Sequence, residues 1–244
     1  FEVANTSLGD SSIGWNGTDQ KLAIADSADW NFGTGNFTIE SWLKVPRALQ
    51  DVTGTLCIID HLNAASLGWR TAIEPTNEGG VSQYRKYFHF RSYSGTTLKS
   101  TIKFEDDSWH HVAIVREGTG TDETKMYIDG VENVTGTFAE DFSVTAALEL
   151  GVISGDTSWF RGNQTEIRIS DTARYTADFM PQLTRFVSDS NTKLLIHSNW
   201  EGGLGEDSSG NGNIFDVTNL VATDKMLDSP TNNFSVVNPL IKPA

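Results

Sequence analysis

The sequence predicts an all-β fold in which two antiparallel sheets pack face to face as a β-sandwich. Turn signals recur about every 8–12 residues, the spacing typical of antiparallel β architecture. Between these turns, apolar and polar residues alternate with a period of two, and no stretch has a convincing helical period. Clear turn signals are Asn16-Gly17, Gly79-Gly80 and Asp129-Gly130.

The predicted strands follow one another in order along the chain. In residues 37–45 apolar side chains occupy mainly one parity, whereas residues 109–116 are almost continuously apolar, which indicates burial on both faces. Residues 125–129 alternate again and end at a dipeptide typical of a tight hairpin. Strands that share an apolar face must bury it against a second sheet. The other predicted strands lie at residues 87–93, 148–152, 167–169 and 194–196.

Two segments of different character are predicted. Residues 1–200 form the sandwich domain, and residues 201–244 form an irregular, extended C-terminal arm or linker, because the chain there is rich in turn residues and poor in apolar ones. We expect this arm to lie on the domain or on a neighbouring subunit, with Pro230, Phe234 and Pro239 as strap contacts. The first residue is not methionine, so we expect the chain to be part of a longer protein.

Composition excludes several classes of function. The chain has 18 Lys and Arg against 32 Asp and Glu, a net charge of −14, and a surface of that sign repels nucleic-acid phosphates. No apolar run reaches the roughly 18–20 residues that span a bilayer, so no membrane insertion is predicted. The single cysteine, Cys57, excludes an intrachain disulfide and a cysteine zinc cluster, and its apolar surroundings predict a buried thiol.

Five stretches carry a family resemblance. Residues 15–24 (WNGTDQKLAI) and 29–42 (DWNFGTGNFTIESW) resemble the opening of a laminin-G-like, concanavalin A-type jelly roll. Residues 109–116 (WHHVAIVR), 125–131 (KMYIDGV) and 166–176 (EIRISDTARYT) resemble its central strand, the hairpin after it and a late strand. The resemblance covers about residues 1–200 and implies a concanavalin A-like lectin/glucanase sandwich.

The C-terminal part carries a second, narrower resemblance. Residues 207–213 (DSSGNGN) and 227–240 (LDSPTNNFSVVNPL) resemble a segment of structural proteins of tailed bacteriophages. This resemblance implies a virion component on the exterior of the particle: a tail fibre, a head fibre or a capsid decoration. The implied partners are other virion proteins, further copies of the chain as a homo-oligomer (a trimer by analogy with fibres), and a bacterial surface glycan.

Carbohydrate binding is the function that the residues favour most. Sugars are held by aromatic rings that stack on their C–H faces and by arginines, amides and carboxylates that bond their hydroxyls. One strand face, opposite Phe88 and Phe90, combines both kinds of group. We expect two residues of other strands to share that concave sheet and two tryptophans in loop-like contexts to lie at its rim. The candidates are Tyr87, His89, Arg91 and Tyr93 on the strand, Trp42 and Arg168 beside it, and Trp69 and Trp159 at the rim.

Two alternatives to glycan binding stay open. In the first, a loop or a partner subunit covers this face, the aromatic residues only pack, and the domain is a structural decoration or spacer without a ligand. The second alternative is a glycan-degrading hydrolase, since the same sandwich carries retaining glucanases with two carboxylates about 5–5.5 Å apart. In residues 166–171 (EIRISD), Arg168 stands at the place of the middle acid and Asp171 has the wrong parity, so no catalytic residue is predicted.

Calcium is the one cofactor that the resemblance brings in, because many laminin-G-like domains hold one calcium ion at the rim. Hard cations prefer several oxygen ligands on loops. The candidate ligands are Asp26, Asp29 and Asp60, the last with Asn63 nearby. Solvated turn residues are the alternative interpretation of these acids, and no EF-hand spacing occurs.

Overall fold

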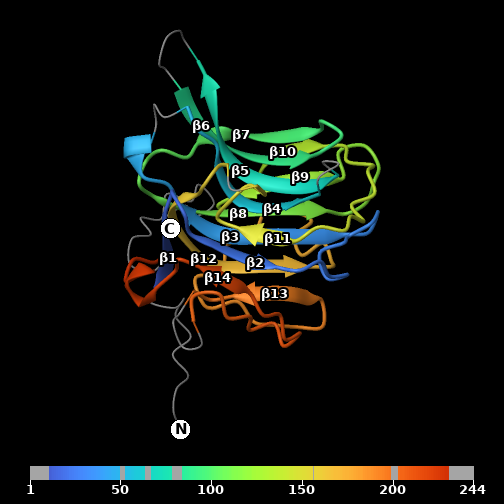
Figure 1. The fold of residues 1–244 in the computed structure, drawn as a ribbon. Helices are drawn as coiled ribbons and strands as arrows, with labels where there is room; N and C mark the ends of the chain where they lie inside the picture. Colours follow the sequence, from blue (N-terminus) through green and yellow to red (C-terminus); the bar gives the residue numbers. More distant parts are fainter. Residues whose placement is uncertain are drawn as a thin grey trace, which may run out of the picture.

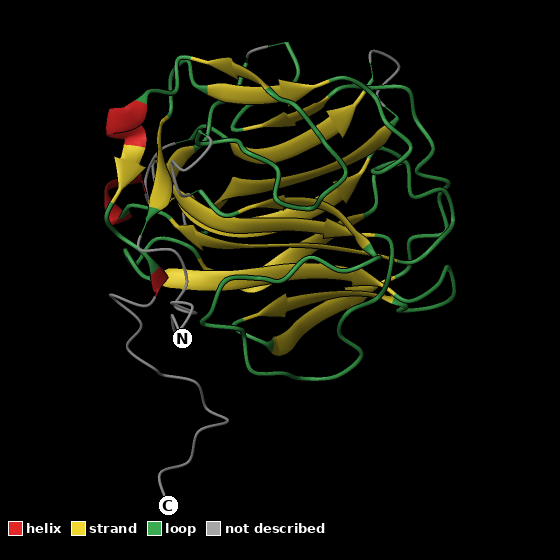
Figure 2. Ribbon diagram, turned by 90° about the horizontal axis from the view of Figure 1, so that it is seen from below, coloured by secondary structure: helices red, strands yellow, loops and turns green. Residues whose placement is uncertain are grey.

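The computed structural model describes residues 11–49, 53–63, 67–78, 84–155, 157–198 and 203–230. Two antiparallel sheets pack face to face, as Figures 1 and 2 show, which confirms the predicted all-β sandwich. Within the described residues the helical elements are two short 3₁₀ turns, η1 (Arg47–Leu49) and η2 (Ala222–Asp224), and no helix is long and apolar enough to span a bilayer.

The first sheet, called the eight-stranded sheet, has the order β10-β9-β8-β3-β12-β1-β15, and β13 pairs with β12. The central strand β12 is long enough to pair with β1 along its first half and with β13 along its second. The strands are β1 (Ser12–Asn16), β3 (Phe37–Lys44), β8 (Trp109–Arg116), β9 (Thr124–Ile128), β10 (Val131–Gly136), β12 (Arg161–Ser170), β13 (Thr192–Ile196) and β15 (Lys225–Met226).

The second sheet, called the seven-stranded sheet, has the order β14-β2-β11-β4-β5-β6-β7. Its longest strands, β5 and β6, pair over nine residues in register, from Trp69 opposite Ser92 to Asn77 opposite Tyr84. The strands are β2 (Lys21–Ile24), β4 (Leu56–Leu62), β5 (Gly68–Asn77), β6 (Tyr84–Ser92), β7 (Thr97–Lys103), β11 (Leu148–Leu150) and β14 (Asp216–Thr218).

The core lies between the inner faces of the two sheets. Phe88 and Phe90 of β6 point into it, as their shared parity predicts, and both are at most 1% exposed. Aromatic rings from both sheets stack there: the Phe32 ring lies 4.5 Å from that of Phe37 and 5.6 Å from that of Trp69, centroid to centroid. The core therefore fixes which side chains of each strand can face outward.

The described part of the C-terminal segment, residues 203–230, belongs to this sandwich rather than to a separate arm. Its strand β14 extends the seven-stranded sheet beside β2, and β15 extends the eight-stranded sheet beside β1. The Asp207 carboxylate accepts the backbone N–H of Leu195 at 3.0 Å, which ties this segment to β13. Apolar side chains at three positions enter the core, so burial and not only hydrogen bonding holds the segment. These residues are Leu204, Phe215 and Leu220. Of the predicted strap contacts, Phe234 and Pro239 lie outside the described residues.

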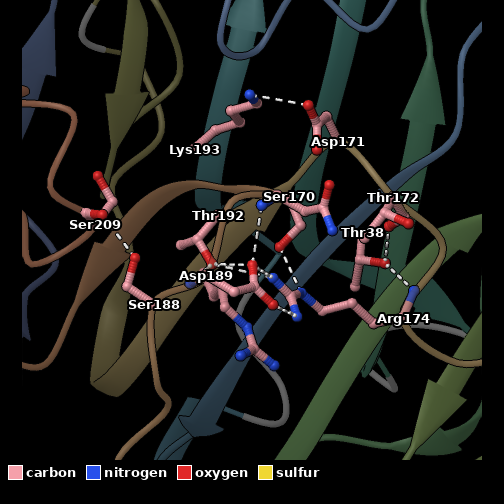
Figure 3. Close-up of polar contacts among 12 residues, drawn as sticks. Thr38, Ser170, Asp171, Thr172, Arg174, Ser188, Asp189, Thr192, Lys193 and Ser209 are labelled. Atoms are coloured by element: carbon pink, nitrogen blue, oxygen red, sulfur yellow. Dashed lines mark hydrogen bonds and ion pairs between the residues drawn. The ribbon is translucent and has the colours of Figure 1, made fainter.

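Residues 171–191, called the covering segment, lie on the outer face of the eight-stranded sheet. Tyr175 and Phe179 pack on one part of that face and Phe186 on another. Arg174 pins the segment: its guanidinium forms a two-point ion pair with Asp189 at 2.8 and 2.9 Å, as Figure 3 shows. The two sheets thus differ, because one outer face is covered by the chain itself.

Candidate functional site

The covered outer face holds two of the predicted ligand residues. Trp42 has no exposed surface and Arg168 is 5% exposed. The Arg168 guanidinium donates to Glu40 at 2.7 and 2.8 Å, and Glu40 also accepts the Tyr175 hydroxyl at 2.8 Å. The expectation that Trp42 and Arg168 share a sheet with Tyr87 is wrong, since they lie on the eight-stranded sheet under the covering segment. Neither side chain offers a surface to a ligand in this structure.

The charge of this buried group is balanced inside the protein. His111 lies with its Nε2 3.2 Å from Glu40. Burial alone would raise the pKa of Glu40, but the hydrogen bond from His111 and the charge of Arg168 outweigh it and lower that pKa to about 2. The carboxylate is therefore ionised at neutral pH and serves as an internal counter-charge. A buried network of this kind holds the covering segment to the sheet and presents no group to a ligand.

The open outer face belongs to strands β4 to β7. Register places Asp60, Arg70 and Arg91 side by side across three strands. The Arg70 Nε donates to Asp60 at 2.7 Å, and the second oxygen of Asp60 accepts the Ser154 backbone N–H at 2.9 Å. Arg91 forms an ion pair with Glu74 of β5. Arg70 and Arg91 are therefore each fixed by one carboxylate of a neighbouring strand.

Tyr87 and His89 lie on the same outer face, as predicted, but neighbouring side chains bury both, to 6% and 7% exposure. The Tyr87 hydroxyl donates to Glu78, and the Lys99 ammonium lies 3.9 Å above the centre of the Tyr87 ring. Burial, and then the charges of Arg91 and Lys99, lower the pKa of His89 to about 4. Its imidazole is therefore neutral at pH 7, so it adds no positive charge to this face.

A pocket of about 220 Å³ opens at one corner of this face, where strand β6 ends; we call it the arginine pocket. Tyr93 is 50% exposed at its edge. Arg91 and Tyr93 were candidates from the sequence, whereas Arg70 was missed, because strand register, which sequence does not give, is what sets it beside Arg91. The pocket is lined by Leu62, Arg70, Arg91, Ser92, Tyr93 and Gly95.

Close backbone packing fixes the edge of the arginine pocket. The Tyr93 backbone N–H donates to the Gly68 carbonyl at 3.2 Å. Gly68 has a φ of +121°, and a Cβ there would lie 1.9 Å from the His61 carbonyl oxygen, so only glycine fits. On the other side, one carboxylate oxygen of Glu140 accepts the hydroxyl of Ser92 at 2.7 Å and that of Thr96 at 3.1 Å. The loop that carries Tyr93 is thereby held in place from both sides.

The two tryptophans predicted at the rim have different positions. Trp69 has no exposed surface and lies in the core, where its Nε1 donates to the Trp30 carbonyl at 3.4 Å. Its rim assignment is wrong, because its parity in β5 is the inward one and the outward side chain is that of Arg70. Trp159 is partly buried, forms an isolated bridge with Val152 and is not one of the residues that line the arginine pocket.

Two of the three carboxylates considered for calcium, those of Asp60 and Asp26, have other partners in this structure. Asp60 is 1% exposed and is engaged by Arg70 and Ser154. Asp26 accepts the side-chain amide of Asn31 at 3.1 Å, and Asp29 is partly buried. Among the described residues, no group of three or more His, Cys, Asp or Glu side chains is arranged to hold a metal ion.

Two residues that bear on the hydrolase alternative are closed from solvent. Glu166 has no exposed surface, and its carboxylate accepts the Phe186 backbone N–H at 2.8 Å and lies 3.0 Å from His197 Nδ1. These contacts of Glu166 include no second carboxylate, which a retaining mechanism would need nearby. Cys57 is buried and unpaired, and burial raises the pKa of its thiol well above the usual value.

Comparison with solved structures finds the same sandwich in proteins of low sequence identity. A Bacteroides ovatus protein whose suggested role is carbohydrate binding matches 86% of this chain at 16% identity and a TM-score of 0.57, and the chain spans 61% of that structure. A heptameric SAP-like pentraxin from Limulus polyphemus matches 86% of this chain and 96% of its own at 14% identity and a TM-score of 0.50. At such identities the likeness shows the fold alone. Comparison with curated proteins finds no match.

The family itself is shown by the sequence. Residues 16–178 match the Laminin_G_3 family model, described as the concanavalin A-like lectin/glucanases superfamily. This stretch is more than half of the 244 residues and contains the whole lining of the arginine pocket. It extends from the end of β1 into the covering segment. The chain therefore belongs to the Laminin_G_3 family of the concanavalin A-like lectin/glucanases superfamily.

Proposed function

We propose that this protein is a non-enzymatic adhesion module that binds a glycan in the arginine pocket. The observation that carries the proposal is the pocket itself: a half-exposed tyrosine ring beside two arginines, on the outer face that the described part of the chain leaves uncovered. Tyr93 supplies an apolar ring face for the C–H side of a sugar, and Arg70 and Arg91 supply hydrogen-bond donors. Binding sites in proteins combine a concave shape with a few placed polar groups in this way.

Membership in a lectin/glucanase superfamily supports the same proposal. So does the Bacteroides ovatus structure, whose suggested role is carbohydrate binding and which has the same fold. One small pocket supports only weak binding, so adhesion would depend on several copies acting together. Linked copies raise the overall avidity by orders of magnitude without any new contact.

We place the module on the exterior of a bacteriophage particle, as part of a tail fibre, head fibre or capsid decoration. The resemblance of residues 207–213 and 227–240 to phage structural proteins supports this setting. Its partners would then be other virion proteins and further copies of itself, with a trimer as the expected assembly, and the ligand would be a bacterial surface glycan. A calcium ion is not needed for the pocket chemistry proposed here, so its role is tested by adding or removing it.

The test is a glycan array probed with the chain displayed in multiple copies, with calcium or with a chelator. We expect binding to some bacterial glycans and loss of that binding, by at least tenfold, in Tyr93→Ala. Val187→Ala is the matched control, because Val187 is 72% exposed on the covering segment and far from the pocket lining. Absence of binding to every glycan, in both conditions and with the chain folded, would contradict the proposal and favour a purely structural role.

A further inference from the structure

We propose that the arginine pocket selects an acidic sugar, one whose carboxylate is bound by Arg70 and Arg91; this inference rests on the proposed glycan binding. The two arginines are direct cross-strand partners in β5 and β6, and both line the pocket. A protein with a net charge of −14 and only 18 Lys and Arg places two of these cations together at an open cavity, where the donors that their carboxylate partners leave unused can bind one anion between them.

The carboxylate partners of Arg70 and Arg91 engage only some of the N–H donors of these arginines. Arg70 uses only its Nε, toward Asp60, and Arg91 uses only one Nη, toward Glu74. A guanidinium has five N–H donors, so most of the donors of this pair have no partner among the described residues. Both side chains also keep accessible surface, 19% for Arg70 and 47% for Arg91. The pocket therefore offers donors that are free to bind a ligand.

The same carboxylates hold the arginines in position before a ligand arrives. Asp60 is itself fixed by the backbone N–H of Ser154, and it is 1% exposed. Glu74 is also shielded, with 12% of its side chain exposed, and lies 3.6 Å from His89. Binding then costs less side-chain entropy, since the guanidinium groups are already ordered. A pair held from below by buried acids and open above is a preorganised anion receptor.

The chemistry of the lining distinguishes an acidic sugar from a neutral one. A neutral sugar hydroxyl both donates and accepts, whereas arginine only donates. Apart from the two arginines and Tyr93, the polar side chain of the lining is Ser92, whose hydroxyl already donates to Glu140. A lining in which arginine donors dominate fits a group that only accepts, and the planar arginine fork matches a carboxylate in shape. Tyr93 and Leu62 remain for the apolar face of the ring.

The experiment compares matched monosaccharides with the single chain in solution. Glucuronic and galacturonic acid are titrated beside glucose and galactose, and beside glucose 6-sulfate, by NMR chemical-shift mapping. We expect the uronic acids to bind at least tenfold more tightly than their neutral parents and than the sulfate ester. Arg91→Gln should abolish this preference, while Arg161→Gln should keep it, because Arg161 is exposed on β12 and carries the same charge outside the pocket.

Each other outcome overturns a different statement. Equal binding of neutral and acidic sugars, lost in Tyr93→Ala, would overturn the acid selectivity and leave the proposed glycan binding intact. Stronger binding of the sulfate ester would overturn the proposed preference for a carboxylate and would assign a tetrahedral anion as the ligand group instead. If neither these sugars nor any arrayed glycan binds to the folded chain, both proposals fail. The amide spectrum of Arg91→Gln shows directly whether the variant is folded, and its exposed position makes us expect that it is.

Discussion

The two outer faces of this sandwich carry nearly the same set of side chains and use them differently. Each has a glutamate that pairs with an arginine and lies beside a histidine and a tyrosine. On the eight-stranded sheet the covering segment closes over the set; on the seven-stranded sheet nothing in the described chain lies over the arginines. The covered set is Glu40, His111, Arg168 and Tyr175, and the open set is Glu74, Tyr87, His89 and Arg91.

Accessibility, and not residue type, separates the two sets. Arg168 has 7% of its side chain exposed, against 47% for Arg91. Glu40 has three hydrogen-bonding side chains around it, so its charge is compensated within the covered set, although Nδ1 of His111 has no hydrogen-bond partner among the described residues. The open set leaves guanidinium donors unpartnered at an exposed side chain, and both ring nitrogens of His89 lack a partner among the described residues. Unpartnered donors that solvent can reach have capacity for a ligand, whereas a compensated and buried cluster supports the fold.

The largest effect expected from this comparison is on stability. Glu40→Gln removes the counter-charge of a buried arginine and should lower the free energy of unfolding by about 3–5 kcal/mol. Glu74→Gln removes the partner of a half-exposed arginine, whose charge water can solvate, and should cost at most about 1 kcal/mol. Urea denaturation of both variants measures the difference. Equal losses would mean that the open set is as much a part of the structure as the covered one.

The stabilising effect of Glu40 should depend on pH. The pKa of Glu40 is lowered to about 2, so its stabilising charge is fully present above the ordinary glutamate pKa, about 4.3, and is lost as the pH falls toward 2. The stability gap between the wild type and Glu40→Gln should therefore narrow between pH 5 and pH 2. Thermal unfolding of both proteins across this range checks it. A gap that stays constant would show that Glu40 does not act through its charge.

How far sequence could predict these faces depends on the strand. Alternation in residues 87–93 placed Phe88 and Phe90 inside and left Arg91 and Tyr93 outside, as the structure has them. Apolar residues on both parities of 109–116 already indicated a sheet covered on both sides. What covers it was not predictable, because residues 171–191 are irregular and have no period to recognise.

Two errors of position have physical causes as well. Gly68 is typical of a loop and so predicts a rim position for Trp69, but the strand begins at Gly68 and turns the tryptophan inward. Arg70 was not a candidate, since its role comes from its position opposite Arg91, and register depends on tertiary pairing. The pocket is thus a product of pairing between strands, which a single sequence does not state.

A smaller effect tests the cover itself. Asp189→Asn breaks the two-point ion pair with Arg174, whose hydrogen bond lowers the pKa of Asp189. Because Asp189 is 46% exposed, water screens the pair, and we expect a loss of about 1 kcal/mol or less. Asp171→Asn, which removes the single-point pair with Lys193 shown in Figure 3, should cost less still. Denaturation together with limited proteolysis of residues 171–191 checks the order; the reverse order would mean that Arg174 does not anchor the cover.

The smallest effect on stability is expected for His89→Phe, and its comparison with His111→Phe is the most discriminating test of the two sets. His111→Phe removes a hydrogen bond to Glu40 and should destabilise the protein measurably, by about 1–3 kcal/mol. His89→Phe should change the stability by less than about 0.5 kcal/mol, because neither ring nitrogen of His89 has a hydrogen-bond partner to lose. If His89→Phe instead costs as much as His111→Phe, then the 3.6 Å gap between His89 and Glu74 closes to a hydrogen bond in solution. Glu74 would then share its charge between His89 and Arg91, and the open set would stabilise the fold as the covered set does. The proposed anion binding would in that case have to rest on Arg70 alone.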